Sequence, residues 1–556
     1  MQEQDNSLVK RFQQRRRAAR AAGVIFLLVG IALLILVLWQ FSLTLLWVSM
    51  ACFVISSPFL FVSMLPPSRR VTTKQTPLAR VPPDTWATHL VQHSPDMRRV
   101  AYVQQEGSQQ RVIVNGQEGR LYEGIGQGSL VFSPDSQQLA YVAKIGGGVE
   151  LVETANIRDI HITGLRQTRP KQMIVVMGGE DGKPHDGVLA GTVVFSPDSC
   201  HLAYVAAVGD RNFVVLDGKE GTIYDAVWGD TLRFNPDSRH LTYVAQRGQA
   251  QIVVLDGQET DAYEGVLEGG VVFSPDSQRL AFAVQQKTGW AVILDRSLGK
   301  TYAGIGAGSL TFSPDSLHLA YVVQSAAKQR VILDGEEAKS YTGIAPGNLV
   351  FSPDSQQLAY IAVEADREFV VVNGKEGRPY DKVLSGGPVF SPDGQHLAYA
   401  ATTLTGRVVV VDEKECKGYS TPVFSADSQW MAFTSWDTNL GKPSVYVTSP
   451  DKLERGAHVG THNGIRIDGI TFGPEVSPGC RLLVYIAVDK ADKETIVLGV
   501  LSRRGVLKEI VLSNMRRRHY DTCAPRGVIL FDSFNQLHYL ATIGEDACLV
   551  EEIVLA

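Results

Sequence analysis

Seven aspartates recur in one local setting, each directly after a proline. Carboxylate oxygens are ligands that Ca²⁺ prefers, so a repeated aspartate could indicate a row of calcium sites. The neighbouring residues favour another role, because Ser, Pro and Asp are residues that tight turns select. We interpret the aspartates as turn formers and expect no bound metal. They are Asp135, Asp198, Asp237, Asp276, Asp315, Asp354 and Asp393.

The motifs of common catalytic sites do not occur in the sequence. It contains no G-x-S-x-G turn, no glycine-rich phosphate loop and no H-E-x-x-H pair. His161 and His185 are isolated, and His185 replaces the tyrosine of other repeat copies, which favours a packing role. The six cysteines lie far apart, which argues against a zinc site or a disulfide framework. The sequence therefore predicts a protein that is not an enzyme and needs no cofactor.

The aspartates belong to a repeat, whose best copy runs from Val131 to Ala143. It returns around Phe195 and then at a constant step of 39 residues up to Phe390. A fixed period of this length is typical of repeat architectures. An earlier copy lies at 90–103, a shortened one follows at Phe424, and two degenerate ones close the chain. The sequence therefore contains eleven copies, of which the last three are the weakest.

Each copy can be divided into four short strands. The Ser-Pro-Asp-Ser turn separates the first two, and Asp-Gly or Asn-Gly pairs, which favour hairpins, separate the last two. The second strand is apolar on both faces, so it needs a sheet in front and another behind. A tyrosine in the fourth strand keeps the same step, and we expect it to fill the gap between sheets. The tyrosines are Tyr224, Tyr263, Tyr302, Tyr341, Tyr380 and Tyr419.

Four-stranded antiparallel sheets that stack face to face around an axis are the blades of a β-propeller. The fold class is therefore all-β, with about eleven blades in residues 84–556. Eleven exceeds the usual four to eight blades, so one large ring and two rings of five and six both remain open. The last copy lacks an obvious fourth strand, which a segment near 71–81 could supply.

The motif resembles that of the WD-repeat-like propeller family, in which blades carry F-S-P-D-G-x-x-L-A-Y/F, as in the TolB-type propellers. The resemblance covers about residues 90–556 and implies a rigid disc used for binding other proteins. Most copies have serine where the family has glycine, and Asp393-Gly394 keeps the family's form. We expect the serine to change the type of turn and to leave the fold intact.

Residues 21–65 form an uncharged apolar run of 45 residues, too long for one membrane-spanning helix and long enough for two. The polar break at 39–42 divides it into spans near 22–39 and 43–64. Basic residues flank both ends, in the tail 1–20 and in the proline-rich linker 66–83, so both ends are predicted to be cytoplasmic. A cleaved signal peptide is the alternative interpretation. We expect an integral protein of a bacterial inner membrane, with its propeller facing the cytoplasm.

The charge is distributed unevenly along the chain. Residues 1–20 and 66–83 each carry a net charge of +4, which leaves −13 on residues 84–556. An acidic body of this kind argues against nucleic-acid binding.

Segments that interrupt the repeat are the best candidates for a partner surface, because propeller insertions emerge as loops. One copy carries 24 extra residues, placed within 145–168, and other long loops lie near 434–468 and 505–526. The basic residues of these loops are the candidate partner-binding residues. They are Arg166, Arg169, Arg516, Arg517, Arg518 and His519.

The predicted function is that of a membrane-anchored, non-enzymatic platform or sensor that binds an unknown protein. One alternative is a propeller that binds a small ligand or catalyses hydrolysis in its central channel. Apolar residues at the innermost positions argue against it, namely Leu130, Val131, Leu232, Val272, Leu310 and Leu349. The other alternative keeps the binding role but places the propeller on the extracytoplasmic side.

Overall fold

The computed structural model describes most of the repeat region. The described residues are 71–81, 91–146, 149–157, 160–167, 171–345, 347, 349–438, 441–466, 469–477, 480–488, 494–502, 505–511, 522–523, 528–533, 536–543 and 546–554. The apolar run 21–65 lies outside them, and no helix within them is long and apolar enough to cross a membrane. The chain divides into two compact units, and the unit Thr73–Glu552 contains blades 1 to 10 and all but the ends of β1 and β53 in blade 11.

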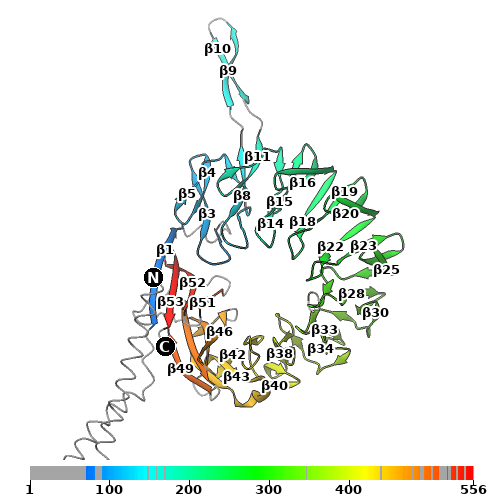
Figure 1. Ribbon diagram of the computed structural model, residues 1–556, viewed down its shortest axis with the longest axis vertical. Coiled ribbons are helices and arrows are strands. Elements are labelled where there is room, and N and C mark those ends of the chain that lie inside the picture. The colour runs from blue at the N-terminus through cyan, green and yellow to red at the C-terminus, as the bar shows by residue number, and fades with distance from the viewer. Residues whose placement is uncertain are drawn as a thin grey trace, which may run out of the picture. The chain divides into compact units, whose positions relative to one another are not determined.

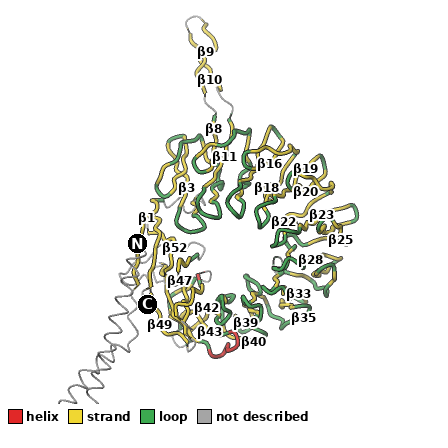
Figure 2. The backbone as a smooth tube through the Cα atoms, viewed as in Figure 1, coloured by secondary structure: helices red, strands yellow, loops and turns green. Residues whose placement is uncertain are grey.

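The described residues form eleven blade sheets and one separate two-stranded hairpin. Figure 1 shows the blades following one another around a single axis in chain order. The described part of the chain contains one helix, the 3₁₀ helix η1 (Pro450–Arg455), drawn red in Figure 2. The prediction of an all-β propeller with eleven blades is therefore confirmed, and the arrangement is one ring.

The strands of the first four blades are given from the centre outwards. Blade 1 has β2 (Val91–His93), β3 (Val100–Glu106), β4 (Gln109–Val114) and β5 (Gln117–Glu118). Blade 2 has β6 (Gly124–Ile125), β7 (Val131–Phe132), β8 (Leu139–Ile145), β11 (Gln172–Met177) and β12 (Glu180–Asp181). Blade 3 has β13 (Gly187–Val188), β14 (Val194–Phe195), β15 (Leu202–Val208), β16 (Arg211–Leu216) and β17 (Lys219–Tyr224). Blade 4 has β18 (Ala226–Phe234), β19 (Leu241–Arg247), β20 (Ala250–Leu255) and β21 (Gln258–Tyr263).

The next four blades repeat this plan. Blade 5 has β22 (Gly265–Phe273), β23 (Leu280–Gln286), β24 (Gly289–Leu294) and β25 (Ser297–Tyr302). Blade 6 has β26 (Gly304–Ile305), β27 (Thr311–Phe312), β28 (Leu319–Ser325), β29 (Lys328–Leu333) and β30 (Glu336–Glu337). Blade 7 has β31 (Gly343–Ile344), β32 (Val350–Phe351), β33 (Leu358–Glu364), β34 (Arg367–Val372) and β35 (Lys375–Glu376). Blade 8 has β36 (Lys382–Val383), β37 (Val389–Phe390), β38 (Leu397–Thr403), β39 (Gly406–Val411) and β40 (Lys414–Lys417).

The last three blades depart from the plan. Blade 9 has β41 (Val423–Phe424), β42 (Met431–Asp437), β43 (Lys442–Thr448) and β44 (Ala457–Thr461). Blade 10 has β45 (Gly464–Ile465), β46 (Thr471–Ser477), β47 (Cys480–Val488), β48 (Glu494–Ser502) and β49 (Gly505–Val511). Blade 11 has β50 (Thr522–Cys523), β51 (Leu530–Ser533), β52 (Gln536–Ile543), β53 (Asp546–Val554) and, outermost, β1 (Val71–Arg80).

The second strand of each blade explains why the blades stack. In β8 the alanines at 140 and 143 are fully buried on opposite faces of the strand. Tyr141 and Ala143 pack against blade 1, whereas Ala140 and Val142 pack against blade 3. Because both faces are apolar, each blade needs a neighbour on either side, and only a closed ring gives every blade two.

The ring closes where the two ends of the repeat region meet. β1 pairs with β53 and supplies the outermost strand of blade 11, as expected for the segment near 71–81. One apolar cluster joins Ala79 and Val81 to Tyr102 of blade 1 and to Leu540 and Ala547 of blade 11. Polar contacts support the same junction, with Lys74 Nζ 2.8 Å from Glu551 Oε2 and Arg98 Nη2 2.9 Å from Asp532 Oδ1.

The fourth-strand tyrosines fill the outer gap between blades, as predicted. Tyr224, Tyr341 and Tyr380 are almost fully buried. Each packs edge to face on the second-strand tyrosine of the next blade, for example Tyr380 on Tyr399 with ring centroids 6.0 Å apart. Such edge-to-face pairs add to the stabilisation from buried area alone.

Tyr419 keeps the sequence step of these tyrosines but not their place, so that prediction is wrong. Its side chain is exposed, and its backbone N–H donates to the Thr434 carbonyl oxygen. Gly126 makes the corresponding bond, to the Val142 carbonyl oxygen, on the innermost strand of blade 2. The cause is a step of only 34 residues from Phe390 to Phe424. With five residues fewer between the two blades, Tyr419 already lies at the innermost strand of blade 9 and not in the outer gap.

The serine that replaces the family's glycine does not change the turn, which corrects our expectation. Ser136 has a φ of 65° and Gly394 a φ of 71°, and both backbone N–H groups donate to the serine carbonyl three residues earlier. The left-handed region is unfavourable for residues with a Cβ. Serine is therefore retained there in spite of a conformational cost.

The hydroxyl of this serine makes a hydrogen bond between blades. Ser136 Oγ accepts the backbone N–H of Asp96 at 3.0 Å, and Ser238 Oγ accepts that of Asp198 at the same distance. The contact occurs at seven junctions and is absent between blades 7 and 8, where Gly394 has no hydroxyl. We call these residues the serine belt; they are Ser136, Ser199, Ser238, Ser277, Ser316, Ser355 and Ser428.

Candidate interaction surfaces

The seven repeated aspartates are engaged in their own turns. Asp135 Oδ1 accepts hydrogen bonds from the Ser133 hydroxyl and from the backbone N–H of Gln137. The same pair of bonds recurs around Asp276, Asp315 and Asp393. No group of three or more His, Cys, Asp or Glu side chains in the described part of the chain could hold a metal ion. Turn formation thus accounts for the repeated aspartate.

These hydrogen bonds change the acidity of the turn carboxyls. The hydroxyl of the turn serine, which favours the ionised form, holds the pKa of Asp135, Asp276 and Asp315 below its ordinary value. A carboxyl with a depressed pKa in the folded state stabilises that state above its unfolded pKa. The stabilisation is lost as the pH falls through the folded pKa.

We therefore expect the free energy of unfolding to be flat with respect to these groups from pH 7 to pH 5. It should fall steeply below about pH 4, the ordinary pKa of aspartate. Urea denaturation at a series of pH values measures this. Asparagine can still accept both hydrogen bonds. Replacing Asp135, Asp276 and Asp315 by asparagine should therefore make the free energy of unfolding fall less steeply below pH 4. If the free energy of unfolding of that variant falls as steeply below pH 4 as that of the unmodified chain, the turn aspartates do not contribute to the acid sensitivity.

Histidines near these turns pair with aspartates on the same face of four blades. His201 Nδ1 lies 2.7 Å from Asp217 Oδ2, and the other oxygen of Asp217 accepts the Leu202 backbone N–H. Equivalent pairs are His240–Asp256, His318–Asp334 and His396–Asp412. Recurrence at one repeat position, with each carboxylate also holding a strand end, favours a structural role over a catalytic dyad.

His185 has the packing role that its position in the repeat indicates. It is buried, its Nε2 lies 3.2 Å from the Tyr204 hydroxyl oxygen, and its ring packs edge to face on Phe213. Burial lowers the pKa of His185, which keeps the ring neutral among apolar neighbours.

The outer rim of the ring carries charges of both signs that pair across blade junctions. Lys183 Nζ lies 2.9 Å from Glu220 Oε1, and Arg378 Nη1 lies 2.7 Å from Glu415 Oε1. Exposed pairs of this kind contribute little to stability.

The insertion in blade 2 forms a hairpin of its own. Strands β9 (Val149–Ile157) and β10 (Ile160–Gln167) pair only with each other among the described strands, and Figure 1 shows them outside the ring. The hairpin enters between β8 and β11, where Ile145 and Gln172 are still register partners. In blades 1 and 3 to 8, two residues make the same connection. The insertion is therefore an addition to a blade that is complete without it.

The structure places one of the six predicted partner-binding residues. Arg166 lies in β10, with Glu150 of β9 as its register partner. Arg169, Arg516, Arg517, Arg518 and His519 lie outside the described residues.

Four of the six innermost positions used to argue against a channel site are buried between blades, and the other two, Val131 and Val272, are partly buried. Leu130, Leu232, Leu310 and Leu349 are buried, and they belong to the apolar clusters between blades. Their apolar character therefore reflects blade packing and does not bear on ligand binding.

A groove that the repeat pattern does not predict lies between the innermost strands of blades 8 and 9. It encloses about 680 Å³ and is lined mainly by apolar residues, including Leu384, Phe390 and Phe424. Its polar lining includes Arg407 at the start of β39 and the exposed Tyr419. The sequence signal for it was the 34-residue step, which removes five residues from the connection between the two blades.

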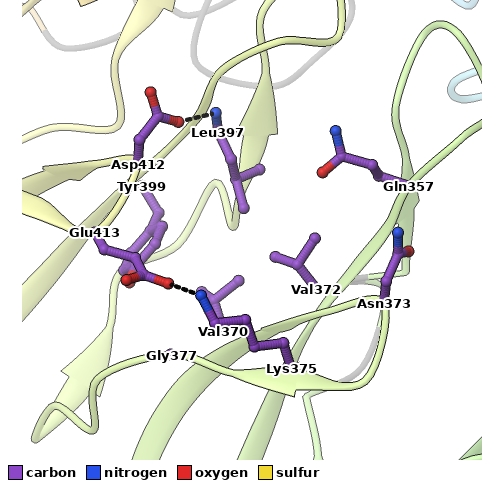
Figure 3. Close-up of a pocket in the computed structure, with 10 residues that line it drawn as sticks. All are labelled: Gln357, Val370, Val372, Asn373, Lys375, Gly377, Leu397, Tyr399, Asp412 and Glu413. Atoms are coloured by element: carbon purple, nitrogen blue, oxygen red, sulfur yellow. Dashed lines mark hydrogen bonds and ion pairs between the residues drawn. The ribbon is translucent and has the colours of Figure 1, made fainter. Parts of the chain in front are cut away.

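A smaller pocket of about 380 Å³ lies between blades 7 and 8 (Figure 3). Val370, Leu397 and Tyr399 form its apolar wall. An ion pair between Lys375 Nζ and Glu413 Oε1, 2.8 Å apart, links the two blades beside it. The pocket lies at the junction of blades 7 and 8, where Gly394 replaces a serine of the serine belt.

Comparison with known proteins gives matches among solved structures. No protein-family model and no curated protein matches the chain. The crystal structure of TolB from Acinetobacter baumannii shares 13% identity over 56% of this chain and 95% of that chain, with a TM-score of 0.23. The β-propeller domain of the Trilobed protease from Pyrococcus furiosus shares 13% identity over 52% and 96%, with a TM-score of 0.25.

A crystal structure of the eukaryotic initiation factor shares 13% identity over 66% of this chain and 96% of that chain, with a TM-score of 0.32. At such identities and TM-scores, these likenesses carry no argument about what the chain binds or does. They do not test the WD-repeat part of the family resemblance either.

Proposed function

We propose that the chain is a membrane-anchored β-propeller that acts as a non-enzymatic platform for protein binding. The observation that carries the proposal is the β9–β10 hairpin, which is added to one of eight blades, 1 to 8, that are otherwise nearly uniform. Segments that a rigid scaffold carries but does not need for its own packing are common sites of binding.

The anchor in this proposal is the uncharged run 21–65, with the propeller on the cytoplasmic side. Its support is the length of the run and the basic residues at both ends. The run should keep the chain in the membrane pellet after alkaline carbonate extraction. Protease added to intact spheroplasts should leave the propeller uncut, whereas cleavage before lysis would place it on the other side.

Excision of the hairpin tests the platform role. Residues 146–171 are replaced by Gly-Asp, the turn that joins Val208 to Arg211 in blade 3. Because Ile145 and Gln172 are register partners, the ring should keep its melting temperature to within about 2 °C. Proteins crosslinked to the full chain in membranes should be lost from the excised variant.

The matched control replaces Gly209-Asp210 by Asn-Gly, which changes an ordinary turn and leaves the hairpin in place. An identical crosslinked set from the excised variant and the control would refute a role for the hairpin in binding.

A further inference from the structure

The groove between blades 8 and 9 exists because one element of the repeat is missing there. In blade 2 the innermost strand begins with β6, whose Ile125 pairs with Ala143 and packs into the cluster between blades 1 and 2. Buried aliphatic residues fill the same place in other blades, for example Val188, Val227, Ile305, Ile344 and Val383. Blade 9 has only β41 paired on the inner side of β42. The Ser435 hydroxyl donates to the carbonyl oxygen of Lys417 at the end of β40, and no described strand pairs with the inner edge of β42 after Thr434.

The edge of β42 next to this gap is suited to pairing with a strand. Trp436 occupies the position of Lys144, whose carbonyl oxygen accepts the backbone N–H of Glu123 in blade 2. The corresponding carbonyl of Thr402 accepts the N–H of Asp381 in blade 8. An incoming extended segment would therefore meet an open strand edge.

Arg407 identifies the charge that the groove would accept. In other blades the residue at its position is an acceptor that caps the inner strand of the next blade. Gln110 Oε1 accepts the Ile125 N–H at 2.6 Å, and Glu368 Oε2 accepts the Val383 N–H at 2.8 Å. Arg407 can only donate, it is exposed, and no hydrogen bond or ion pair of its side chain is found among the described residues. At this position the groove therefore has a donor in place of an acceptor, and among the described residues the guanidinium has no partner.

The chain itself shows which sequence fills such a gap. An acidic residue, a small residue and an aliphatic residue open the innermost strand at Glu123-Gly124-Ile125, Asp186-Gly187-Val188 and Glu264-Gly265-Val266. At the junction of blades 7 and 8, the acidic residue pairs with an arginine of the preceding blade, since Arg367 Nη1 lies 3.1 Å from Asp381 Oδ1.

We propose that this groove binds an extended peptide segment of a partner protein by β-strand addition. The peptide pairs with the inner edge of β42, places an aliphatic side chain between Leu384 and Phe424, and sets an acidic side chain against Arg407. Strand addition supplies affinity through the backbone, and the pocket and the charge supply specificity. The inference names a binding site within the platform proposed above and rests on that function.

Direct binding of a defined peptide tests the proposal on the full chain. The probe is a fluorescein-labelled peptide of residues 262–272 of this chain, which contains Glu264-Gly265-Val266. Saturable binding is expected by fluorescence anisotropy. Arg407→Glu should weaken it by at least about tenfold, because a repulsive pair replaces an attractive one. The matched control is Arg296→Glu, which reverses an exposed arginine in a blade 5 turn and should leave binding unchanged.

Two further variants exclude a general loss of folding. A peptide carrying Glu264→Lys should bind Arg407→Glu better than it binds the unmodified chain. Insertion of Gly-Ile-Gly-Ala-Gly between Tyr419 and Ser420 restores the 39-residue step. It should raise the melting temperature and abolish peptide binding, because the chain then fills its own groove.

Three results would overturn the proposal: no saturable binding, equal binding to Arg407→Glu, or full binding to the insertion variant. Binding of decanoate in the groove, with no binding of the peptide, would also overturn it, in favour of a small amphipathic ligand. Excision of the β9–β10 hairpin should leave peptide affinity unchanged. Failure of this inference is thus distinguishable from failure of the platform proposal, which is read out by crosslinking.

Discussion

A chain that begins at residue 82 is expected to lose most of the stability of the ring. The truncation removes β1 and Val81, so blade 11 loses its outermost strand and the junction with blade 1 loses Ala79 and Val81 from its core. The Tyr102 hydroxyl, which donates to the Arg80 carbonyl oxygen at 2.9 Å, also loses its partner. Burial and strand pairing on this scale correspond to at least about 4 kcal/mol.

The control for this truncation is a chain that begins at residue 66, which removes the predicted membrane segment and keeps β1. Urea denaturation followed by tryptophan fluorescence compares the two chains. Adding a synthetic peptide of residues 70–81 should restore part of the lost stability, because the strand then binds in trans. Equal denaturation midpoints for the two truncated chains would show that β1 does not close the ring.

The second large effect is expected from the serine belt. Replacing Ser136, Ser238 and Ser316 by alanine removes three hydroxyls that accept backbone N–H groups of the preceding blade. Alanine keeps the Cβ, so the unfavourable left-handed backbone remains at all three positions. At about 1 kcal/mol for each hydrogen bond, and more where the N–H becomes unsatisfied, the triple variant should lose about 3 to 5 kcal/mol.

Glycine at the same three positions is the matched control. It removes the same hydroxyls but relieves the left-handed strain, which costs about 1 to 2 kcal/mol per residue when a Cβ is present. The triple glycine variant should therefore be clearly more stable than the triple alanine variant in urea denaturation. If the alanine variant is as stable as the unmodified chain, the belt hydrogen bonds do not contribute to the stability of the ring.

The sequence predicts the architecture well because the same pattern of strand and turn residues recurs at a constant step. The constant step between Phe195 and Phe390, the turn residues and the second strand buried on both faces together specify the blade. The closing strand near 71–81 could be inferred because blade 11 lacked a fourth strand and the ring needed one. The choice between one ring and two rings was left open, because repeats of similar sequence do not indicate which copies are neighbours in space.

The errors have a common origin in contacts between blades. Serine at positions such as 136 looked like a change of turn, because its hydrogen bond reaches a residue 40 positions earlier in the chain. Leu130 looked like a channel position, whereas its side chain lies between two sheets. Tyr419 matched the tyrosine step, but the five-residue deletion behind it moved it to another strand. The repeat period gives the position of each residue in the sequence. The roles of Ser136, Leu130 and Tyr419 depend instead on contacts between neighbouring blades, which the period does not specify.

The candidate groove was recognisable only in part. The 34-residue step marks the site in the sequence, and arginine stands where other copies have residues such as Gln110 or Glu368. The meaning of that exchange depends on the hydrogen bond that Gln110 and Glu368 make to the next blade. That bond is visible only in three dimensions.

The position of β1 has a mechanical consequence. Any pulling force applied to the polypeptide ahead of residue 71 enters the ring through β1, the strand whose pairing with β53 holds the ring shut. Such a force would therefore be resisted first by the pairing of β1 with β53. Detachment of β1 would lengthen the free chain ahead of the ring without separating strands in the middle of a blade. The β1–β53 pairing would therefore be the first contact to break under load.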